Sequence, residues 1–227
     1  MFRYRFFQVI LAIAVVMLIV SSAVFISFQG VNISEAEYTS EMTGRTFESD
    51  GADGSETALT EFEAWLEYSI IADGLKETGN NVDFDKGNVK LCDYNLTQLR
   101  QLKKVKDEAK RMMFLSVILL IIGFLAVKKR RMYECVVWGG VAASVIGMVS
   151  LILLAVSGSG IFYGVREMVF KGRYDVFFSG DDRLIALIPD NLGLRMFLIY
   201  TGVILTGLVI TIIVRLISWR KTQPHKF

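Results

Sequence analysis

The chain has 227 residues, of which 53% are hydrophobic, and its mean hydropathy is +0.46. Soluble domains usually contain about 45–50% apolar residues, so this composition excludes an ordinary soluble domain and predicts an integral membrane protein. The formal net charge is only +2, and the sequence contains no internal repeat, no phosphate-binding glycine loop and no nucleic-acid-binding motif. We therefore expect no nucleic acid among its partners.

Four apolar stretches are candidate spans, because a membrane-spanning helix needs about 20 mostly apolar residues. The first stretch could instead be a signal peptide, since it follows the basic start MFRYR and ends near SSA. Its uncharged run is longer than the roughly 7–15 residues of a signal-peptide core, which favours a span, although retention or cleavage stays open. The predicted spans are residues 6–28, 112–127, 136–157 and 196–214.

Basic residues gather in three segments that alternate with the rest of the chain. These are the N-terminal end before the first span, the turn 128–135 and the tail 215–227; together they carry a net charge of +9, whereas the remainder carries −7. The positive-inside rule places such basic segments in the cytoplasm. We therefore predict a multi-pass protein of the cell membrane with both termini cytoplasmic and with residues 29–111 and 158–195 outside.

The first outer segment, 29–111, is predicted to contain two helices. Residues 30–58 are polar and acidic, and their glycine, serine and aspartate content is typical of loops, which predicts an exposed linker. The following stretch, ALTEFEAWLEYSIIADGL, has apolar and aromatic residues at helical spacing, which predicts a short amphipathic helix. We expect its aromatic face, with Phe62 and Trp65, to pack on the protein core.

The ends of this short helix carry recognisable signals. Thr60 and Glu63 have the spacing of a capping box, in which each residue bonds to the backbone of the other. Gly74 is placed to end the helix, because glycine is common just after the last helical turn.

A second outer helix is predicted to start near Asp93 or Asn95, since both residue types are common N-caps. Apolar residues then recur every three or four positions up to Met112, so this helix should continue into the second span and end near Val127. Basic residues fill its other faces and either bind anionic lipid headgroups or are simply solvated. They are Arg100, Lys103, Lys104, Lys106, Lys110 and Arg111.

The second outer segment, 158–195, alternates basic residues with bulky apolar ones in REMVFKGRYD. This pattern is typical of an interfacial loop whose apolar side chains enter the acyl region while its cations meet headgroups; the alternative is a plain connector. LIALIP, which ends at Pro189, is predicted to lie on the membrane before the last span. The residues predicted to bind lipid headgroups are Arg166, Lys171 and Arg173.

No metal or cofactor site is predicted. The sequence has no CxxC motif and no metal-spaced cluster, and its two cysteines, Cys92 and Cys135, are expected on opposite sides of the membrane. They therefore cannot form a disulfide with each other. The one histidine, His225, lies in the cytoplasmic tail, so no histidine can act as a base on the outer side.

Three motifs occur in a characteristic order: LTEFEAWLEYSIIADGL, then FDKGNVKLCDYNLTQLRQLKKV entering a span, and, after two more apolar stretches, REMVFKG followed by DDRLIALIP. This order resembles the lipoprotein intramolecular transacylase family of Gram-positive bacteria. The resemblance implies four spans with both termini inside and two outer segments. It also implies a reaction that moves the sn-2 acyl chain of a diacylglyceryl-cysteine lipoprotein onto the α-amino group of that cysteine, so the implied partner is a membrane lipid or lipoprotein.

The chain departs from this family where the resemblance implies two outer histidines. One, in an H-x-x-D-V stretch, falls on Lys90 or Leu91, with Asp93 matching the family aspartate; the other, in an F-H pair, falls on Arg166. Arginine remains protonated at neutral pH and cannot act as a base, although it can stabilise an oxyanion or hold a phosphate. The candidates for a replacement base are Asp93, Lys90 and Glu167.

The sequence thus predicts an all-α protein of four transmembrane helices with a small helical extracytoplasmic domain. Its predicted function is that of a transacylase relative, with altered or lost catalysis, that acts on or binds lipid or lipoprotein at the outer membrane face. The alternative is a non-catalytic membrane scaffold or partner-binding protein. A transporter is disfavoured, because transport sites usually place charges within the spans and these spans contain none. The oligomeric state does not follow from the sequence.

Overall fold

The computed structural model describes residues 2–50, 56–77, 82–84, 86–89, 91, 93–126, 129–155, 183–189 and 191–222. These residues fall into two compact units. The spanning unit consists of Met1–Ile26, Glu108–Val165 and Leu198–Phe227. The small unit consists of Ser27–Asp107 and Arg166–Phe197.

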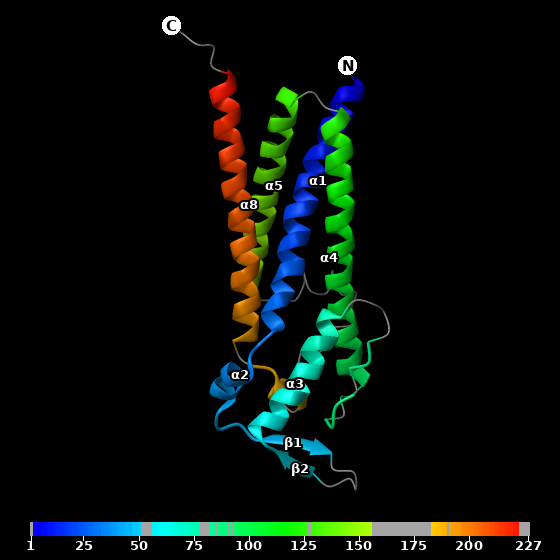
Figure 1. Ribbon diagram of the computed structural model, residues 1–227, viewed down its shortest axis with the longest axis vertical. Helices are drawn as coiled ribbons and strands as arrows, with labels where there is room; N and C mark the ends of the chain where they lie inside the picture. The colour runs from blue at the N-terminus through cyan, green and yellow to red at the C-terminus, as the bar shows by residue number, and fades with distance from the viewer. Residues whose placement is uncertain are drawn as a thin grey trace. The chain divides into compact units, whose positions relative to one another are not determined.

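Helices make up most of the described chain (Figure 1). The all-α class predicted from the sequence is confirmed, with one small hairpin added to it. In chain order the elements are α1 (Phe2–Ser27), the 3-10 helix η1 (Phe28–Val31), α2 (Glu35–Met42), β1 (Phe47–Asp50), β2 (Glu56–Leu59), α3 (Glu61–Lys76), α4 (Asp93–Ala126), α5 (Lys129–Ala155), α7 (Arg183–Leu187) and α8 (Leu192–Thr222).

Four helical stretches of the described chain are long and apolar enough to cross a membrane. The predicted uninterrupted helix from the outer segment into the second span is present as α4. Large apolar side chains such as Leu125 and Trp138 are 85% and 72% exposed. So much exposed apolar surface suits contact with lipid rather than water. The four stretches are Phe6–Val31, Asn95–Ala126, Tyr133–Ser150 and Leu192–Trp219.

Glycines on α5 and elsewhere let the helices of the spanning unit approach closely. A Cβ on Gly139 would lie 2.6 Å from the carbonyl oxygen of Ala12 on α1, and one on Gly147 would lie 2.6 Å from Cγ2 of Ile204 on α8. Small residues are the usual means of close helix packing in lipid, where no hydrophobic force drives helices together. Helix α1 also packs on α4, because Leu11 is buried beside Leu120 and Cys135. The first apolar stretch therefore behaves as one of the packed spans.

The predicted linker at residues 30–58 is wrong. Ser34 accepts a hydrogen bond from the main-chain N–H of Glu37 and caps α2, and β1 then pairs antiparallel with β2, Phe47 opposite Leu59. Tyr38 and Phe47 are buried within the small unit. These apolar residues are too widely spaced among polar ones to produce a periodic pattern, so the composition alone resembled a loop.

Helix α3 begins as predicted but buries a different face. The capping box of Thr60 and Glu63 is present in full. The predicted aromatic face is wrong, however, since Phe62 is 50% exposed and the buried face carries Ala64, Tyr68, Ile71, Ala72 and Leu75.

Gly74 does not end α3, which continues to Lys76. A Cβ on Gly74 would lie 2.6 Å from Cε1 of Phe84, so this glycine is needed for the close approach of the buried Phe84 ring rather than as a stop. Likewise, LIALI does not present all its apolar residues to the membrane. It forms α7, which packs on α3 and β1 and buries Leu184, Leu187 and the following Pro189 in the small unit.

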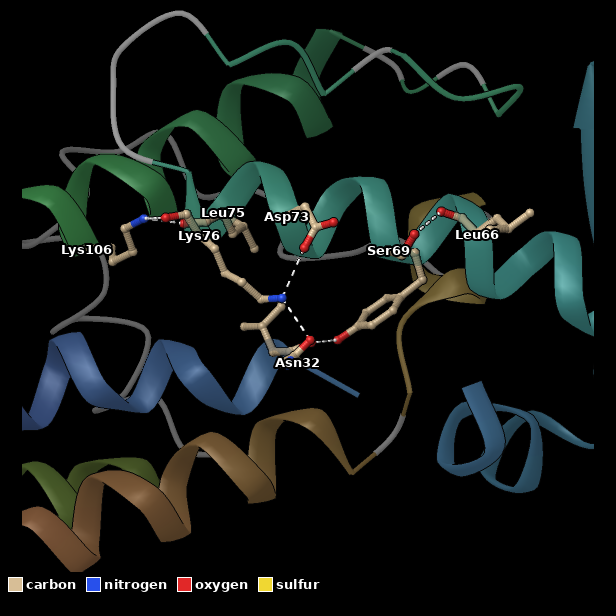
Figure 2. A network of polar contacts seen from close by, with 9 residues as sticks. Asn32, Leu66, Ser69, Asp73, Leu75, Lys76 and Lys106 are labelled. Atoms are coloured by element: carbon tan, nitrogen blue, oxygen red, sulfur yellow. Dashed lines mark hydrogen bonds and ion pairs between the residues drawn. The ribbon is translucent and has the colours of Figure 1, made fainter. Parts of the chain in front are cut away.

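Two of the predicted solvated or headgroup-binding lysines are buried instead. The Lys106 ammonium donates hydrogen bonds to the main-chain oxygens of Leu75, Lys76 and Glu77, at 2.8 Å and 3.0 Å for the last two. Lys103 also donates to the Glu77 oxygen. Figure 2 shows Lys106 of α4 reaching the last turn of α3. The lysines thus cap α3, since the carbonyls of the last helical turn have no partner within the helix.

We expect Lys106→Met to destabilise the protein by about 2–4 kcal/mol, because it leaves buried carbonyls without a charged donor. Lys104→Met, an exposed site on the same helix, is the matched control and should change stability by no more than about 0.5 kcal/mol. Thermal unfolding in detergent measures both. Equal melting temperatures for the two variants would contradict a capping role for Lys106.

Candidate functional site

The described residues contain only one of the site residues predicted from the sequence. Asp93 is the first residue of α4, it is exposed, and its main-chain oxygen accepts a 2.8 Å hydrogen bond from the Thr97 hydroxyl. The others lie outside the described residues, so their mutual geometry stays a prediction. They are Lys90, Arg166, Glu167, Lys171 and Arg173.

The segment that leads to Asp93 is held by a carboxylate that sequence reasoning missed. Glu67 of α3 is only 6% exposed, and it accepts hydrogen bonds from the main-chain N–H groups of Asn88 (2.7 Å, to Oε1) and Val89 (3.3 Å, to Oε2). Because each carboxylate oxygen accepts a main-chain N–H of the loop, Glu67 anchors the loop to α3.

The loop and the start of α4 are also fixed by burial. Val89 and Leu91 are buried, and so are the polar side chains of Asn95 and Gln98 in the first turns of α4. Amide groups of this kind can donate and accept hydrogen bonds but do not take up a proton at neutral pH. The described part of the chain holds no group of three metal-ligating side chains.

A second polar cluster lies where α2, α3, α7 and the start of α8 meet within the small unit. The rings of Tyr38 and Tyr68 pack with centroids 5.2 Å apart. Their hydroxyls donate to main-chain oxygens, that of Tyr38 to Leu187 (2.9 Å) and that of Tyr68 to Val31 (2.6 Å). These bonds join segments distant in sequence, so we assign both tyrosines a structural role.

An ion pair borders this tyrosine cluster. The Arg195 guanidinium donates to Oε1 of Glu37, and both side chains are partly exposed. Arg195 is the cation at the start of the last apolar helix, and Glu37 belongs to α2, the helix that the sequence did not predict. The pair therefore fixes α2 to the first turn of α8.

The missed residues could have been found only in part. Glu67 follows Ala64 by three positions and precedes Ile71 by four, so it lies on the buried face of α3. A carboxylate on a buried face needs hydrogen-bond donors. The sequence does not show that these donors are the main-chain N–H groups of a loop about twenty positions later.

Burial raises the pKa of Tyr38 and of Tyr68 well above the usual value of 10.0. Because the folded tyrosines hold their protons more tightly than the unfolded ones, they stabilise the fold fully while the pH is below the pKa of the unfolded tyrosines. As the pH rises above that value, the unfolded tyrosines lose their protons before the folded ones do, and the stabilisation is lost. We therefore expect stability to fall above about pH 10. Ultraviolet titration should show one late-ionising phenol fewer in Tyr38→Phe and in Tyr68→Phe; ionisation of both near pH 10 in the folded protein would contradict this.

Comparison with known proteins concerns the whole fold. No protein-family model and no curated protein sequence matches the chain. Among solved structures, the membrane integral lipoprotein intramolecular transacylase from Bacillus cereus matches with a TM-score of 0.71 and 12% identity over 97% of each chain. Two structures of that protein with one histidine replaced, by arginine or by alanine, match at 0.69 with 11% and 13% identity, covering 97% of this chain and 93% and 96% of theirs. The chain is thus a multi-pass membrane protein with the fold of this transacylase, as the order of its motifs predicted.

Proposed function

We propose that the protein binds or acts on lipidated substrate, a lipoprotein or its lipid, at the outer face of the cell membrane, with transacylase catalysis altered or lost. The observation that carries this proposal is a transacylase fold over 97% of the chain in a sequence whose single histidine, His225, is in the tail.

The proposed reaction class defines what a catalyst would have to supply. In transfer of an acyl chain from an ester to an amine, the amine nitrogen attacks the ester carbonyl, the carbon–oxygen bond breaks, and the released alkoxide takes a proton. A base must remove a proton from the attacking amine, and donors must stabilise the oxyanion. In this chain Asp93, Lys90 and Glu167 are the candidates for the base.

The basic residues of the second outer segment suit binding better than proton transfer. Arg166 can donate several hydrogen bonds to a phosphate or an oxyanion but cannot accept a proton. With Lys171 and Arg173 it forms the proposed headgroup-binding set. Loss of chemistry with retained binding is therefore our preferred form of this function.

The proposal requires the small unit to lie outside and both termini to lie in the cytoplasm. In a variant with Cys92 and Cys135 changed to alanine, we expect a membrane-impermeant maleimide to label Lys104→Cys in intact cells. Glu134→Cys should react only after the membrane is opened. Both positions are exposed, so access to the reagent is set by the membrane, and the reverse labelling would overturn the orientation.

The function itself is tested with a diacylglyceryl-cysteine lipopeptide and the purified protein. We expect binding without formation of the lyso product that carries an N-linked acyl chain, as read by mass spectrometry. Arg166→Ala should weaken binding by about tenfold, the loss of one charge-assisted hydrogen bond, whereas Lys221→Ala in the cytoplasmic tail should not.

Two other results of this experiment have a defined meaning. Formation of the N-acylated lyso product would show that catalysis survives, and Asp93→Asn, Lys90→Met and Glu167→Gln would then identify the base. Absence of any binding of lipopeptide or lipid would refute the proposal and favour the scaffold alternative.

A further inference from the structure

We infer that Glu67 is a positioning residue that fixes the loop at Gly87, Asn88 and Val89, which leads to α4, and through this loop the substrate affinity of a site at Asp93. This inference rests on the proposed function for its substrate, a diacylglyceryl-cysteine lipoprotein. Its structural half, the control of the loop by Glu67, stands on the contacts alone.

The first argument is the environment of the carboxylate. Glu67 is 6% exposed, and among the residues that the structure describes no cation pairs with it. A buried carboxylate without hydrogen bonds is strongly unfavourable. The N–H groups of Asn88 and Val89 therefore stabilise the buried Glu67 carboxylate, and the carboxylate in turn holds the loop. Two adjacent N–H groups on one carboxylate also fix the direction of the main chain.

The second argument is the fit of Gly87 against the same carboxylate. A Cβ on Gly87 would overlap Oε2 of Glu67 and lie 2.8 Å from its Cδ, a separation that real side chains do not tolerate. Any other residue at position 87 would therefore push the carboxylate away from Asn88 and Val89. Glu67 and Gly87 form a matched pair, which the sequence separation of twenty residues conceals.

The third argument is that the segment is held on both sides of Asp93. Glu67 fixes residues 88 and 89, and Leu91 is buried. Beyond Asp93, the buried Asn95 and Leu99 fix α4. Asp93 lies between these two held stretches, so releasing the loop from Glu67 would alter where Asp93 meets a substrate.

The decisive variant is Glu67→Gln, which keeps the size of the side chain. Its amide oxygen can accept a hydrogen bond from one of the two N–H groups, but its NH₂ group would then face the second N–H, which it cannot bond. We expect hydrogen exchange of residues 86–89 to accelerate by about tenfold, the loss of one such hydrogen bond. Affinity for the lipopeptide should fall several-fold. Glu61→Gln, the same change on the first residue of α3, is the control and should alter neither.

The Gly87 contact provides a second test, which remains informative even if the Glu67→Gln variant fails to fold. Gly87→Ala should loosen the loop in the wild-type background but have a much smaller effect when Glu67 is alanine, because the colliding carboxylate is then absent. This non-additivity is the signature of direct contact. Additive effects of the two substitutions on exchange would overturn the inference.

The outcomes separate this inference from the proposed function. If the wild-type protein binds the lipopeptide and Glu67→Gln loosens the loop without changing affinity, the positioning role is wrong while the proposed function stands. If exchange in the loop is coupled to Glu67 and Gly87 but no form of the protein binds lipopeptide, the proposed function fails and the inference keeps only its structural half.

Discussion

The small unit depends on the capping of α3 by a buried cation from α4. The last carbonyls of a helix lack intrahelical partners and carry partial negative charge. Lys106 supplies three hydrogen bonds to this end, and Lys103 supplies another. The Asp107 carboxylate lies 3.7 Å from both ammonium groups and offsets part of their positive charge. Without these contacts α3 would end in buried, unpaired carbonyls. The packing of α3 on α4 therefore depends on the positions of the two lysines along α4.

The opposite side of α3 is joined to the segment that follows α1. Lys76 donates to the side chains of Asn32 and Asp73, at 2.8 Å and 3.0 Å (Figure 2). Tyr68 donates to the carbonyl of Val31. Helix α3 therefore contacts α4 through its C-terminal carbonyls, the η1 segment through Tyr68 and Lys76, and the loop before α4 through Glu67. An element fixed on three sides is a suitable support for a loop whose position matters.

The sequence predicted those features that depend on local pattern or on overall hydropathy. The spans follow from apolar runs, the capping box from the spacing of Thr60 and Glu63, and the continuous α4 from its leucine periodicity. Prediction from the sequence failed for polar residues that are buried against partners distant in the chain. Lys106 had the pattern of a solvated residue, and no sequence pattern distinguished Glu67. Prediction also failed for α2 and the hairpin, because their buried residues are few. Asp93 begins α4, where the sequence predicted a helix to start, whereas the contact between Glu67 and the preceding loop requires the tertiary fold.

The contacts that hold the described part of the fold lie between packed helices and within the small unit. The spanning helices are held by close glycine contacts such as Gly139 on Ala12, and the small unit by the Lys106 cap and the tyrosine pair. None of these contacts uses a histidine. The residues that hold the fold can therefore differ from those that carry out acid–base chemistry, since function resides in a site carried by the fold. A chain with 12% identity keeps the architecture. Under the proposed function, the residues to compare between such proteins are therefore the proposed anchors of the site, Glu67 and Gly87, as much as the candidate reacting groups.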